Sequence, residues 1–595
     1  MISGNRSVPP SASITACSIS YIKVTTTTAD GSKLLLFNRW FGSTVPTYIL
    51  RDVSFTANPG QVLAIVGPSG AGKSTLLDIL AARLLPTKGT LLLNSSPLDP
   101  STYRRISAHV PQHDHALPLL TVRETFAFTA HLLLHDSSLA SEAVTALLSD
   151  LNLTHIANSR LSHHLSGGER RRISIGLSLL HDPAVLLLDE PTSGLDSCSA
   201  FNVMQTLKNI ATTRDTTVIV SIHQPSFKIL DTIDSILLLS KGTLIHHGTI
   251  SSLQSFLESR SFHVPPQINS LEYAMEIITQ LHSTGDVVET TMIGDEELND
   301  NNNKNKNKKQ QPQYRCSQAK EIVTLYMRFC KIIYRTRQLL MTNALEAVGV
   351  GLLLATLYTH LGLDKKGVEK RLGLFAFTLT FLLSSTTEAL PIFVNERPVL
   401  LRETSSGVYR LSSHLIANTL VFLPYLLVLS VVYSSAVYFI VGLCNSWEAF
   451  GFFVLVTWVV VLMANSFTLF LSCLAPNYIA GTSLLTMSLA GFFLFSGYFI
   501  GKENMPKYWV FMHYLSLYKY ALDALIENEY GCSRSKCFEW DGDYCSMTGM
   551  DYLVSKNLGD GSQRWSNVQI MVGYFVLYRI LYWVVLARRI SISNK

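Results

Sequence analysis

The stretch Gly67-Pro-Ser-Gly-Ala-Gly-Lys-Ser-Thr75 decides how the first half of this chain folds. It fits the pattern G-x-x-x-x-G-K-S/T, in which a glycine-rich loop lies between a strand and a helix. The preceding residues 61–66 predict a buried strand, and residues 74–83 predict the helix that follows. This order predicts a phosphate-binding loop, because amide groups and the helix N-terminus then face an anion.

The loop predicts a set of contacts to a nucleotide. Lys73 would neutralise the β- and γ-phosphates, and Ser74 would hold Mg²⁺. The glycines let the backbone curl around phosphate without a Cβ in the way. A chance Gly/Ser loop before a helix is the alternative, and further motifs along the chain argue against it. The residues expected to contact the nucleotide are Gly67, Pro68, Ser69, Gly70, Ala71, Gly72, Lys73, Ser74 and Thr75.

The composition indicates several domains and a part that lies in lipid. A chain of 595 residues is too long for a single domain. Charged residues make up 15% and hydrophobic residues 48%, whereas soluble domains carry about 25% charged residues. The net charge of +5 is modest for this length and does not indicate nucleic-acid binding. Residues 1–16 lack the pattern of a secretory signal, so we expect the first half to stay in the cytosol.

Two stretches before the phosphate loop, residues 13–24 and 48–55, alternate apolar and polar side chains. This alternation predicts half-buried strands. Tyr21 or Tyr48 could stack on an adenine ring. A core or edge position in the sheet explains either tyrosine equally well.

Gln112 follows the loop at the end of another predicted strand. There it is suited to touch Mg²⁺ and the attacking water, although a glutamine in a surface loop is commoner. Residues 120–134 and 141–151 then predict two helices, which would form a small helical lobe.

A second anion cradle is predicted at residues 165–169, where a Ser-Gly-Gly turn opens a helix. Two anion cradles on one domain favour a dimer. In such a dimer one face of each chain would complete the anion site on the facing chain. The residues of this cradle expected to contact nucleotide are Ser166, Gly167, Gly168 and Glu169.

A wholly apolar strand, residues 184–188, ends in Asp189 and Glu190. We expect Asp189 to reach Mg²⁺ and Glu190 to polarise the water that attacks the γ-phosphate. An Asp-Glu pair that caps a helix is the alternative, and the buried strand before it argues against that.

Two more polar residues follow this strand. Asp196 directly follows a Ser-Gly-Leu turn and is expected to signal across a dimer interface. The next buried strand, residues 216–222, leads into His223, which could bond the γ-phosphate as a sensor. A lone histidine is usually structural, but this one lies at the carboxyl end of a strand, where such sheets bind ligands.

These motifs, in this order, resemble the ATP-binding cassette of ABC transporters. The resemblance implies an α/β P-loop ATP-binding cassette with a RecA-like core and a helical lobe, and ATP and Mg²⁺ as cofactors. It implies two cassettes that sandwich two ATPs, each between Walker A of one chain and Ser166 and Gly168 of the other. The implied catalytic residues are Glu190, His223 and Gln112, and the implied metal ligands are Ser74, Gln112 and Asp189. The matches are Walker A (67–75), the Q-loop (Gln112), the signature (165–169), Walker B (186–190), the D-loop (193–196) and the H-loop (His223).

The sequence turns polar from Asp286, and such a stretch cannot bury a core. We therefore expect a disordered linker over residues 286–316. Apolar side chains then recur at helical spacing among Lys and Arg, which predicts an amphipathic connecting helix at the inner membrane surface. The expected domains are an N-terminal extension with the cassette (1–285), the linker (286–316), the connecting helix (317–338) and the transmembrane domain (339–595).

Six apolar stretches follow, each near the ~20 residues that cross a bilayer. An even number puts both ends on one side, which the cassette requires to be cytosolic. The loop with Arg397, Arg402 and Arg410 and the basic tail then lie inside, in line with the positive-inside rule. The third outside loop, about 501–567, is long. The stretches are 339–361, 373–394, 414–442, 449–474, 478–500 and 568–587.

One cassette followed by six spans resembles the G (White) subfamily of half-size ABC transporters, and most of all its plant members. The resemblance implies an all-α six-helix transmembrane domain of the type II exporter kind. It also implies a homodimer, or a heterodimer with another G-type half-transporter. Residues 394–403 with Tyr409 and Arg410 look like the family's inner loop, which implies a coupling element that presses on the cassette. Residues 265–270 depart from the Asn-Pro-Ala-type motif of many members. We therefore assign no role to the turn that they form.

Cys532, Cys537 and Cys545 cluster in the long outside loop, where disulfides persist. Three cysteines allow one bridge and leave one over, which could pair across a dimer or stay free.

Four residues of the membrane half keep two explanations each. Glu346 and Glu388 lie within spans, where ionisable groups are costly and often functional, and helix–helix hydrogen bonding is the alternative. Tyr498 and Phe499 are candidates for the bulky plug that the family has above a central cavity. Simple aromatic packing at the interface explains them equally well.

The resemblance implies an ATPase coupled to export of amphipathic small molecules or lipids across a membrane. In plants the family's range includes hormones, cuticular and suberin lipids, and specialised metabolites, and nothing in the sequence chooses among them. The expected location is the plasma membrane, with the spans in membrane lipid and the cassette in the cytosol. The alternative is a membrane-bound regulatory or channel-like subunit that is gated by ATP and does not itself export.

Overall fold

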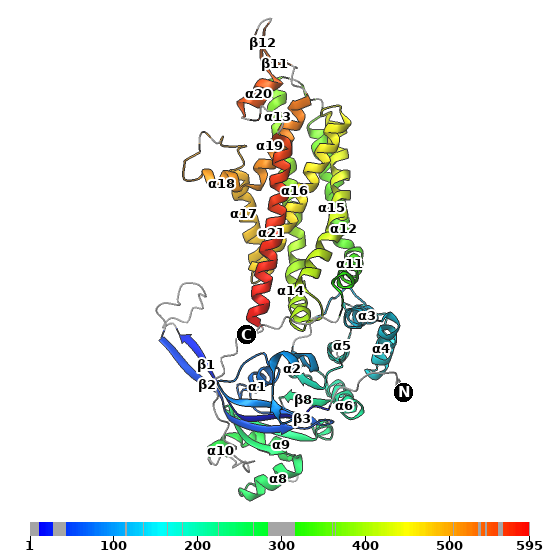
Figure 1. Ribbon diagram of the computed structural model, residues 1–595, viewed down its shortest axis with the longest axis vertical. Coiled ribbons are helices and arrows are strands. Elements are labelled where there is room, and N and C mark those ends of the chain that lie inside the picture. The colour runs from blue at the N-terminus through cyan, green and yellow to red at the C-terminus, as the bar shows by residue number, and fades with distance from the viewer. Residues whose placement is uncertain are drawn as a thin grey trace. The chain divides into compact units, whose positions relative to one another are not determined.

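The chain divides into two compact units in the computed structural model (Figure 1). The first comprises Met1–Cys316 with Ser406–Val408 and Ile592–Lys595, and the second comprises Ser317–Ser405 with Tyr409–Ser591. The first is an α/β body and the second a bundle of helices. The structure describes residues 11–27, 43–112, 116–134, 136–162, 165–180, 182–223, 225–265, 267–283, 316–359, 361–362, 364–501, 503, 505–532, 537–541, 544–556, 558 and 563–593. The predicted linker, 286–316, lies outside these residues except for Cys316.

A six-stranded sheet forms the centre of the first unit. Its strands are β3 (Val62–Val66), β6 (Ser107–Val110), β7 (Val185–Leu188), β8 (Thr217–Ile222), β9 (Ser235–Ser240) and β10 (Thr243–Gly248), in the order β10-β9-β3-β8-β7-β6. All neighbours pair in parallel except β10 with β9. Every residue of β3, β7 and β8 is buried, because parallel strands are covered on both faces. The three apolar runs predicted as buried strands are these three strands.

A second, antiparallel sheet packs beside the phosphate loop. It contains β1 (Ile14–Thr27), β2 (Ser43–Ala57), β4 (Lys88–Leu93) and β5 (Ser96–Pro97) in the order β2-β1-β4-β5. Ile14 from β1, Leu50 from β2 and Leu63 from β3 belong to one hydrophobic core, so the two sheets fold as one body. The two strands predicted before the loop are therefore present and longer than the sequence pattern indicates.

Helices cover the sheet and form a lobe beside it. α3 and α4 are the two predicted lobe helices, and a capping box of Thr121 and Glu124 starts α3. α5 packs against α3, α6 and β6, so it joins the lobe to the sheet. The helices of this unit are α1 (Lys73–Leu80), α2 (Pro100–Ile106), α3 (Val122–Leu133), α4 (Ser137–Asp150), α5 (Gly167–Leu179), α6 (Ser197–Arg214), α7 (Phe227–Leu230), α8 (Ile250–Ser259), α9 (Ser270–Glu276) and α10 (Ile278–Ser283), with a 3₁₀ turn, η1, at Thr154–Ile156.

The second unit is almost entirely helical. A long helix, α15, packs against α11, α12 and α16, and α16 is the most deeply buried of the long apolar helices. The elements are α11 (Gln318–Arg335), α12 (Arg337–Leu357), α13 (Lys365–Ser385), η2 (Thr386–Ala389), α14 (Leu390–Ser405), α15 (Leu411–Val441), α16 (Trp447–Leu474), α17 (Tyr478–Leu494), α18 (Val510–Leu515), α19 (Leu517–Cys532), β11 (Cys537–Asp541), β12 (Tyr544–Thr548), α20 (Gly549–Ser555) and α21 (Gln563–Ser593).

Within the described residues, 5 helical stretches are long and apolar enough to cross a membrane. α17 is apolar as well but has only 17 residues. The predicted span 478–500 is thus helical only to Leu494, and beyond it Gly497 takes a φ of 91° that no helix continues. The five stretches are Arg337–Leu357, Lys366–Ser405, Leu411–Val441, Trp447–Leu474 and Gln563–Ser591. The count of six spans stays a prediction.

The segment 394–403, expected in an inner loop, is helical and belongs to α14. The turn lies later, at residues 406–410. Arg328 on α11 holds this turn through a bidentate pair with Glu403, with Nη1–Oε1 at 2.9 Å and Nη2–Oε2 at 3.0 Å. Tyr409 donates to the same carboxylate at 2.7 Å. The predicted connecting helix is α11, and a buried ion pair ties it to the bundle.

A buried helix, α19, lies in the region 501–567 that the sequence predicts as an outside loop. It packs against α13, α16, α17 and α20. Glu529 accepts hydrogen bonds from Arg371 Nε on α13 at 3.1 Å and from the Cys444 amide at 3.0 Å. The mixture of tyrosines with acidic residues in α19 resembles an interfacial segment, and the partners of Glu529 lie far away in the sequence.

Of the prediction for Cys532, Cys537 and Cys545, the single bridge within the cluster is confirmed, but the left-over cysteine is neither free nor paired across a dimer. Cys537 pairs with Cys545, and Cys532 pairs with Cys444 in the turn between α15 and α16. The fourth cysteine was missed because it lies 88 residues away and outside the cluster. Both bridges are on one side of the bundle, as an oxidising compartment requires.

The two disulfides predict unequal effects on stability. Cys444–Cys532 closes 88 residues and Cys537–Cys545 closes 8, and loop-closure entropy makes the longer bridge worth about 2 kcal/mol more. A Cys444→Ser/Cys532→Ser chain should therefore melt at a lower temperature than a Cys537→Ser/Cys545→Ser chain, measured by thermal unfolding in lipid nanodiscs. Equal melting temperatures, or peptide maps of the unreduced protein that lack the long bridge, would contradict the pairing.

Candidate functional site

The phosphate loop connects β3 to α1, and two of its glycines are required by close contacts. A Cβ on Gly67 would lie 2.3 Å from the Leu239 carbonyl oxygen. Gly72 has a φ of 99°, and a Cβ there would lie 2.8 Å from Leu50 Cδ2. Any other residue would push the loop away from the sheet, so these glycines fix the shape that the phosphates would meet.

Lys73 starts α1 and folds back over the loop. Its Nζ donates to the carbonyl oxygens of Gly67 at 2.6 Å and Pro68 at 3.1 Å. Burial lowers its pKa, while the nearby carboxylates of Glu190 and Asp189 act in the opposite direction. The ammonium is thus held inside the loop that would enclose the phosphates.

Ser74 and Asp189 meet where a metal ion would lie. Ser74 Oγ donates to Asp189 Oδ1 at 3.2 Å, although 115 residues separate them. A hydroxyl and a carboxylate oxygen side by side suit Mg²⁺, which takes few protein ligands and completes its shell with water and phosphate. Both residues were predicted as metal ligands, and the structure brings them together.

Glu190 faces Gln112 across the same edge of the sheet. Gln112 Nε2 donates to Glu190 Oε2 at 2.8 Å. Glu190 has a φ of 44°, which is strained for a residue with a side chain and is typical of functional sites. The Glu190 amide donates to Ser221 Oγ at 2.8 Å, which stabilises this backbone conformation. Gln112 thus contacts the predicted catalytic carboxylate directly.

His223 lies against the phosphate loop. Its Nε2 is 3.1 Å from Ser69 Oγ, and the two residues are 154 positions apart. His223 follows β8, so it stands at the same carboxyl edge as Asp189 and Glu190. The position agrees with a histidine that bonds the terminal phosphate.

The second predicted cradle is formed but stands apart from the loop. Ser166 caps α5: its Oγ accepts from the Glu169 amide at 3.2 Å, and Glu169 Oε2 accepts from the Ser166 amide at 2.8 Å. Ser166 and Gly167 are exposed. Among the residues described, no hydrogen bond links Ser166, Glu169 or Asp196 to the phosphate loop. Asp196 caps α6 by accepting from the Ser199 amide at 3.0 Å.

Comparison with known proteins identifies the family. Residues 50–193 match the ABC transporter family model, and residues 223–294 and 320–530 match models described as ABC-2 type transporter. Over 554 residues the chain is 61% identical to ABC transporter G family member 8 of Arabidopsis thaliana, covering 92% of this chain and 93% of the relative. It is 60% identical over 558 residues to member 4 of that plant, covering 92% and 96%. The chain belongs to the ABC transporter G family.

Membership in the G family establishes the general activity of the chain, which is ATP-driven transport across a membrane. The chain is a half-size transporter with an α/β ATP-binding domain followed by a helical transmembrane domain, so the predicted fold class and family are confirmed. It is a multi-pass membrane protein in which ATP hydrolysis drives transport across the membrane. Because it is half of a transporter, it acts as a dimer.

Of the two candidate adenine-stacking tyrosines of this G-family member, the structure favours Tyr48. Tyr48 is 52% exposed, whereas Tyr21 packs against the hydrophobic core. The neighbouring Ile49 carbonyl oxygen lies 3.1 Å from where a Cβ of Gly72 would be, so this part of β2 borders the phosphate loop. Adenine stacking on Tyr48 stays a prediction.

Two functional residues were missed from the sequence. Ser221 Oγ donates to Asp189 Oδ1 at 2.7 Å and accepts from Glu190 N, so it positions the Asp189 carboxylate and the Glu190 backbone. Arg171, 3% exposed, donates to the carbonyl oxygens of Pro111 at 2.6 Å and Asp189 at 2.6 Å. Three consecutive arginines follow the signature, and nothing in the sequence distinguishes one of them from the others. For Ser221, its place one residue before the end of β8 was an available signal.

Replacing Arg171 should slow hydrolysis more than it weakens ATP binding. Arg171→Lys cannot bridge the two carbonyls, so Gln112 and Glu190 lose their alignment and kcat should fall about ten- to a hundredfold. Steady-state ATPase assays in proteoliposomes and binding of a fluorescent ATP analogue would measure the two effects. Arg172→Lys is the matched control, because Arg172 bonds the Leu151 carbonyl in the helical lobe. An equal loss in both variants would argue against this positioning role.

Proposed function

We propose that this half-transporter exports amphipathic small molecules or lipids from the cytosol across the plasma membrane, as a homodimer or with another G-type half-transporter. The observation that carries the proposal is the division of the nucleotide site. One chain gathers the phosphate loop, the two carboxylates, Gln112 and His223 at one edge of its sheet, and leaves the Ser166 cradle exposed and unused. A second cassette would supply the missing cradle.

In this proposal each ATP lies between the phosphate loop of one chain and the residues Ser166 to Glu169 of the other. The N-terminus of α5 points free amides at the γ-phosphate, and the capping box keeps Ser166 in place for it. Mg²⁺ held by Ser74 and Asp189 would neutralise charge that develops on the phosphates. Asp196 lies at the start of α6, which packs against α5, so it is placed to sense closure of the two cassettes.

Hydrolysis in this proposal depends on Glu190. Its carboxylate accepts a proton from the attacking water, and Gln112 holds that carboxylate in place until substrate arrives. His223 donates to the terminal phosphate once that phosphate displaces Ser69 as its partner. Lys73 leaves the Gly67 and Pro68 carbonyls for the phosphates, which gives the loop a charged donor matched to its ligand.

The cysteines support the proposed location. Cys444–Cys532 and Cys537–Cys545 support a membrane whose far side is oxidising, and the outer face of the plasma membrane is such a side. The substrate class follows only from the apolar and aromatic character of the spans. Hormones, cuticular or suberin lipids and specialised metabolites all fit it.

Glu190→Gln should leave ATP binding intact and abolish turnover. The amide keeps the size of the side chain and its contact with Gln112 but cannot accept the proton from water, so kcat should fall by two orders of magnitude or more, in the range of about 10²–10⁴. ATPase rate and bound nucleotide would be measured on reconstituted dimers. Normal turnover in this variant would refute the assignment of Glu190.

Shared ATP sites can be tested with a mixed dimer. When one chain carries Glu190→Gln and the other Ser166→Arg, both defects fall on one ATP if the sites are shared, and the second ATP site stays intact. The dimer should then match a dimer of Glu190→Gln with unaltered chain. If each chain held a complete site of its own, the mixed dimer would be inactive while that reference dimer kept half its rate. Two affinity tags purified in sequence would isolate the mixed species.

Transport itself separates export from a regulatory role. ATP-dependent accumulation of substrate in inside-out vesicles should occur with the unaltered protein and be lost with Glu190→Gln. Untargeted metabolite profiling of cells lacking the protein would supply the candidate substrates. ATPase activity without vectorial accumulation of any candidate, with every partner chain tested, would favour the gated subunit instead.

A further inference from the structure

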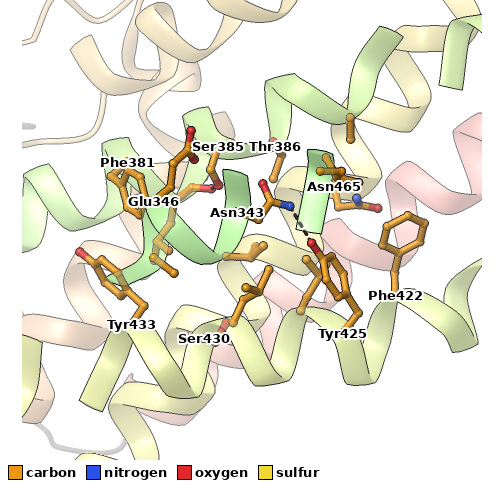
Figure 2. A pocket seen from close by; sticks show the side chains of 17 residues that line it. Asn343, Glu346, Phe381, Ser385, Thr386, Phe422, Tyr425, Ser430, Tyr433 and Asn465 are labelled. Atoms are coloured by element: carbon orange, nitrogen blue, oxygen red, sulfur yellow. Dashed lines mark hydrogen bonds between the residues drawn. The ribbon is translucent and has the colours of Figure 1, made fainter. Parts of the chain in front are cut away.

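We propose that a cavity within the helical unit binds the hydrogen-bond-donating end of an amphipathic ligand, a hydroxyl or an ammonium group, and rejects carboxylates. The cavity lies between α12, α13, η2, α15 and α16 of a single chain (Figure 2). This inference deepens the proposed function, because it assigns a chemical class to what the transporter carries. It concerns a pocket complete within one chain, so it does not depend on how two chains meet.

The size of the cavity limits it to part of a ligand. Its volume is about 50 Å³, whereas pockets that enclose a whole drug-sized molecule measure about 300–1,000 Å³. Phe381 and Tyr433 stack at one end with ring centroids 5.4 Å apart and planes at 27°. The Tyr433 hydroxyl donates to Thr378 at 3.1 Å, so this residue offers its ring rather than its polar end. The cavity therefore has room for one polar substituent and the first atoms of the apolar group that carries it.

Two buried polar atoms on residues that line the cavity have no hydrogen-bond partner among the described residues. Asn343 donates through Nδ2 to the Tyr425 hydroxyl at 2.7 Å, which leaves its Oδ1 buried and unbonded among the described residues. Ser430 is 1% exposed, and its Oγ also lacks a partner in that part of the chain. Figure 2 shows both residues on the cavity wall with Glu346. Unpaired polar atoms are costly in an apolar interior, so a ligand that donates to them gains affinity.

The charged groups around the cavity are acidic. Glu346 lines it, and Glu388 is its acidic neighbour. None of the lining residues is Lys, Arg or His. An anionic ligand would therefore meet carboxyl groups and an amide oxygen, while a hydroxyl or ammonium group would donate to them. Glu346 is only partly buried, which leaves its carboxyl within reach from outside.

The basic residue Arg579 lies next to the cavity but does not line it. Arg579 Nη2 lies 3.5 Å from Asn465 Oδ1, and Asn465 lines the cavity. The guanidinium is turned toward Asn418 at 2.8 Å and Ser466 at 3.0 Å. Asn465 thus separates Arg579 from the cavity, and the ligand would meet the acidic side.

The test uses three photoreactive probes that share one skeleton, a trifluoromethyl aryl diazirine that carries a hydroxymethyl, an aminomethyl or a carboxylate group. The full-length protein in lipid nanodiscs is irradiated with each probe, and labelled peptides are mapped by mass spectrometry. The alcohol and the amine should label the lining segments of α12, α13 and α15 at least about fivefold more than the carboxylate, which corresponds to one donor–acceptor hydrogen bond gained. Excess benzyl alcohol or benzylamine, which carry no diazirine, should suppress that labelling.

Matched variants locate the effect. Ser430→Ala should reduce labelling by the alcohol several-fold. Ser435→Ala on the same helix should not, because Ser435 bonds its own backbone at Val431 and does not line the cavity. Glu346→Gln should reduce labelling by the amine more than by the alcohol, since it removes charge and keeps shape. Size-exclusion profiles of the variants confirm that each is folded.

Three results would overturn the proposal: labelling by the carboxylate probe that equals or exceeds the other two, labelling that no competitor suppresses, or labelling that Ser430→Ala leaves unchanged. The first would assign the cavity to anions drawn by Arg579. Labelling needs neither ATP nor transport. A protein that is labelled as expected but transports nothing would support this site and contradict the proposed function. A protein that transports its substrate but is not labelled as expected would support the proposed function and contradict this site.

Discussion

The carboxyl edge of the parallel sheet is the constraint on which the nucleotide site depends. Parallel strands end at one edge, so residues that follow β3, β6, β7 and β8 must meet there whatever their distance in sequence. The pairs Ser74–Asp189, Gln112–Glu190 and Ser69–His223 span 115, 78 and 154 residues. No local segment can form any of them, and the site therefore exists only when the whole sheet has folded.

The same architecture explains why one chain holds two unlike half-sites. α5 begins at an exposed Ser166 and, one turn later, buries Arg171 against the carbonyls of Pro111 and Asp189. α5 would thus bind the partner's nucleotide with its N-terminus. Through Arg171 the same helix also holds the backbone next to Gln112 and Glu190 of its own chain. A rigid helix transmits a displacement at its first turn to the second with little loss. Engagement of one ATP would in this way adjust the alignment of Gln112 and Glu190 at the other.

The motifs of the first unit could be predicted because their function resides in short stretches. The helix-opening turn at Ser166 could likewise be interpreted as an anion cradle, whereas the spatial order of the strands was not predicted. Arg171 and Ser221 could not be singled out, since their role lies in contacts that only the folded sheet brings together. In the second unit the apolar stretches predicted the helices that are long enough to cross a membrane. The bridge from Cys444 to Cys532 and the buried pair of Arg371 with Glu529 were hidden, because each joins residues more than eighty positions apart.

Three arginines of the helical unit pair with carboxylates, whereas Arg397 and Arg579 have neutral hydrogen-bond partners among the described residues, and Arg579 is the one that lies near the cavity. Arg371, Arg328 and Arg410 each face a carboxylate, Glu529, Glu403 and Glu321 respectively. Arg579, 5% exposed, instead has three neutral partners among the residues the structure describes: Asn418, Asn465 and Ser466. A buried cation that is solvated only by amide and hydroxyl dipoles keeps a positive field around it. The acidic pair of Glu346 and Glu388 lies on the other side of the cavity wall that Asn465 forms, so the cavity sits in a field that runs from Arg579 toward the two carboxyls. A hydroxyl whose proton points toward the carboxyls turns its oxygen toward the cation, so both ends of its dipole are stabilised, and a group turned the opposite way is not.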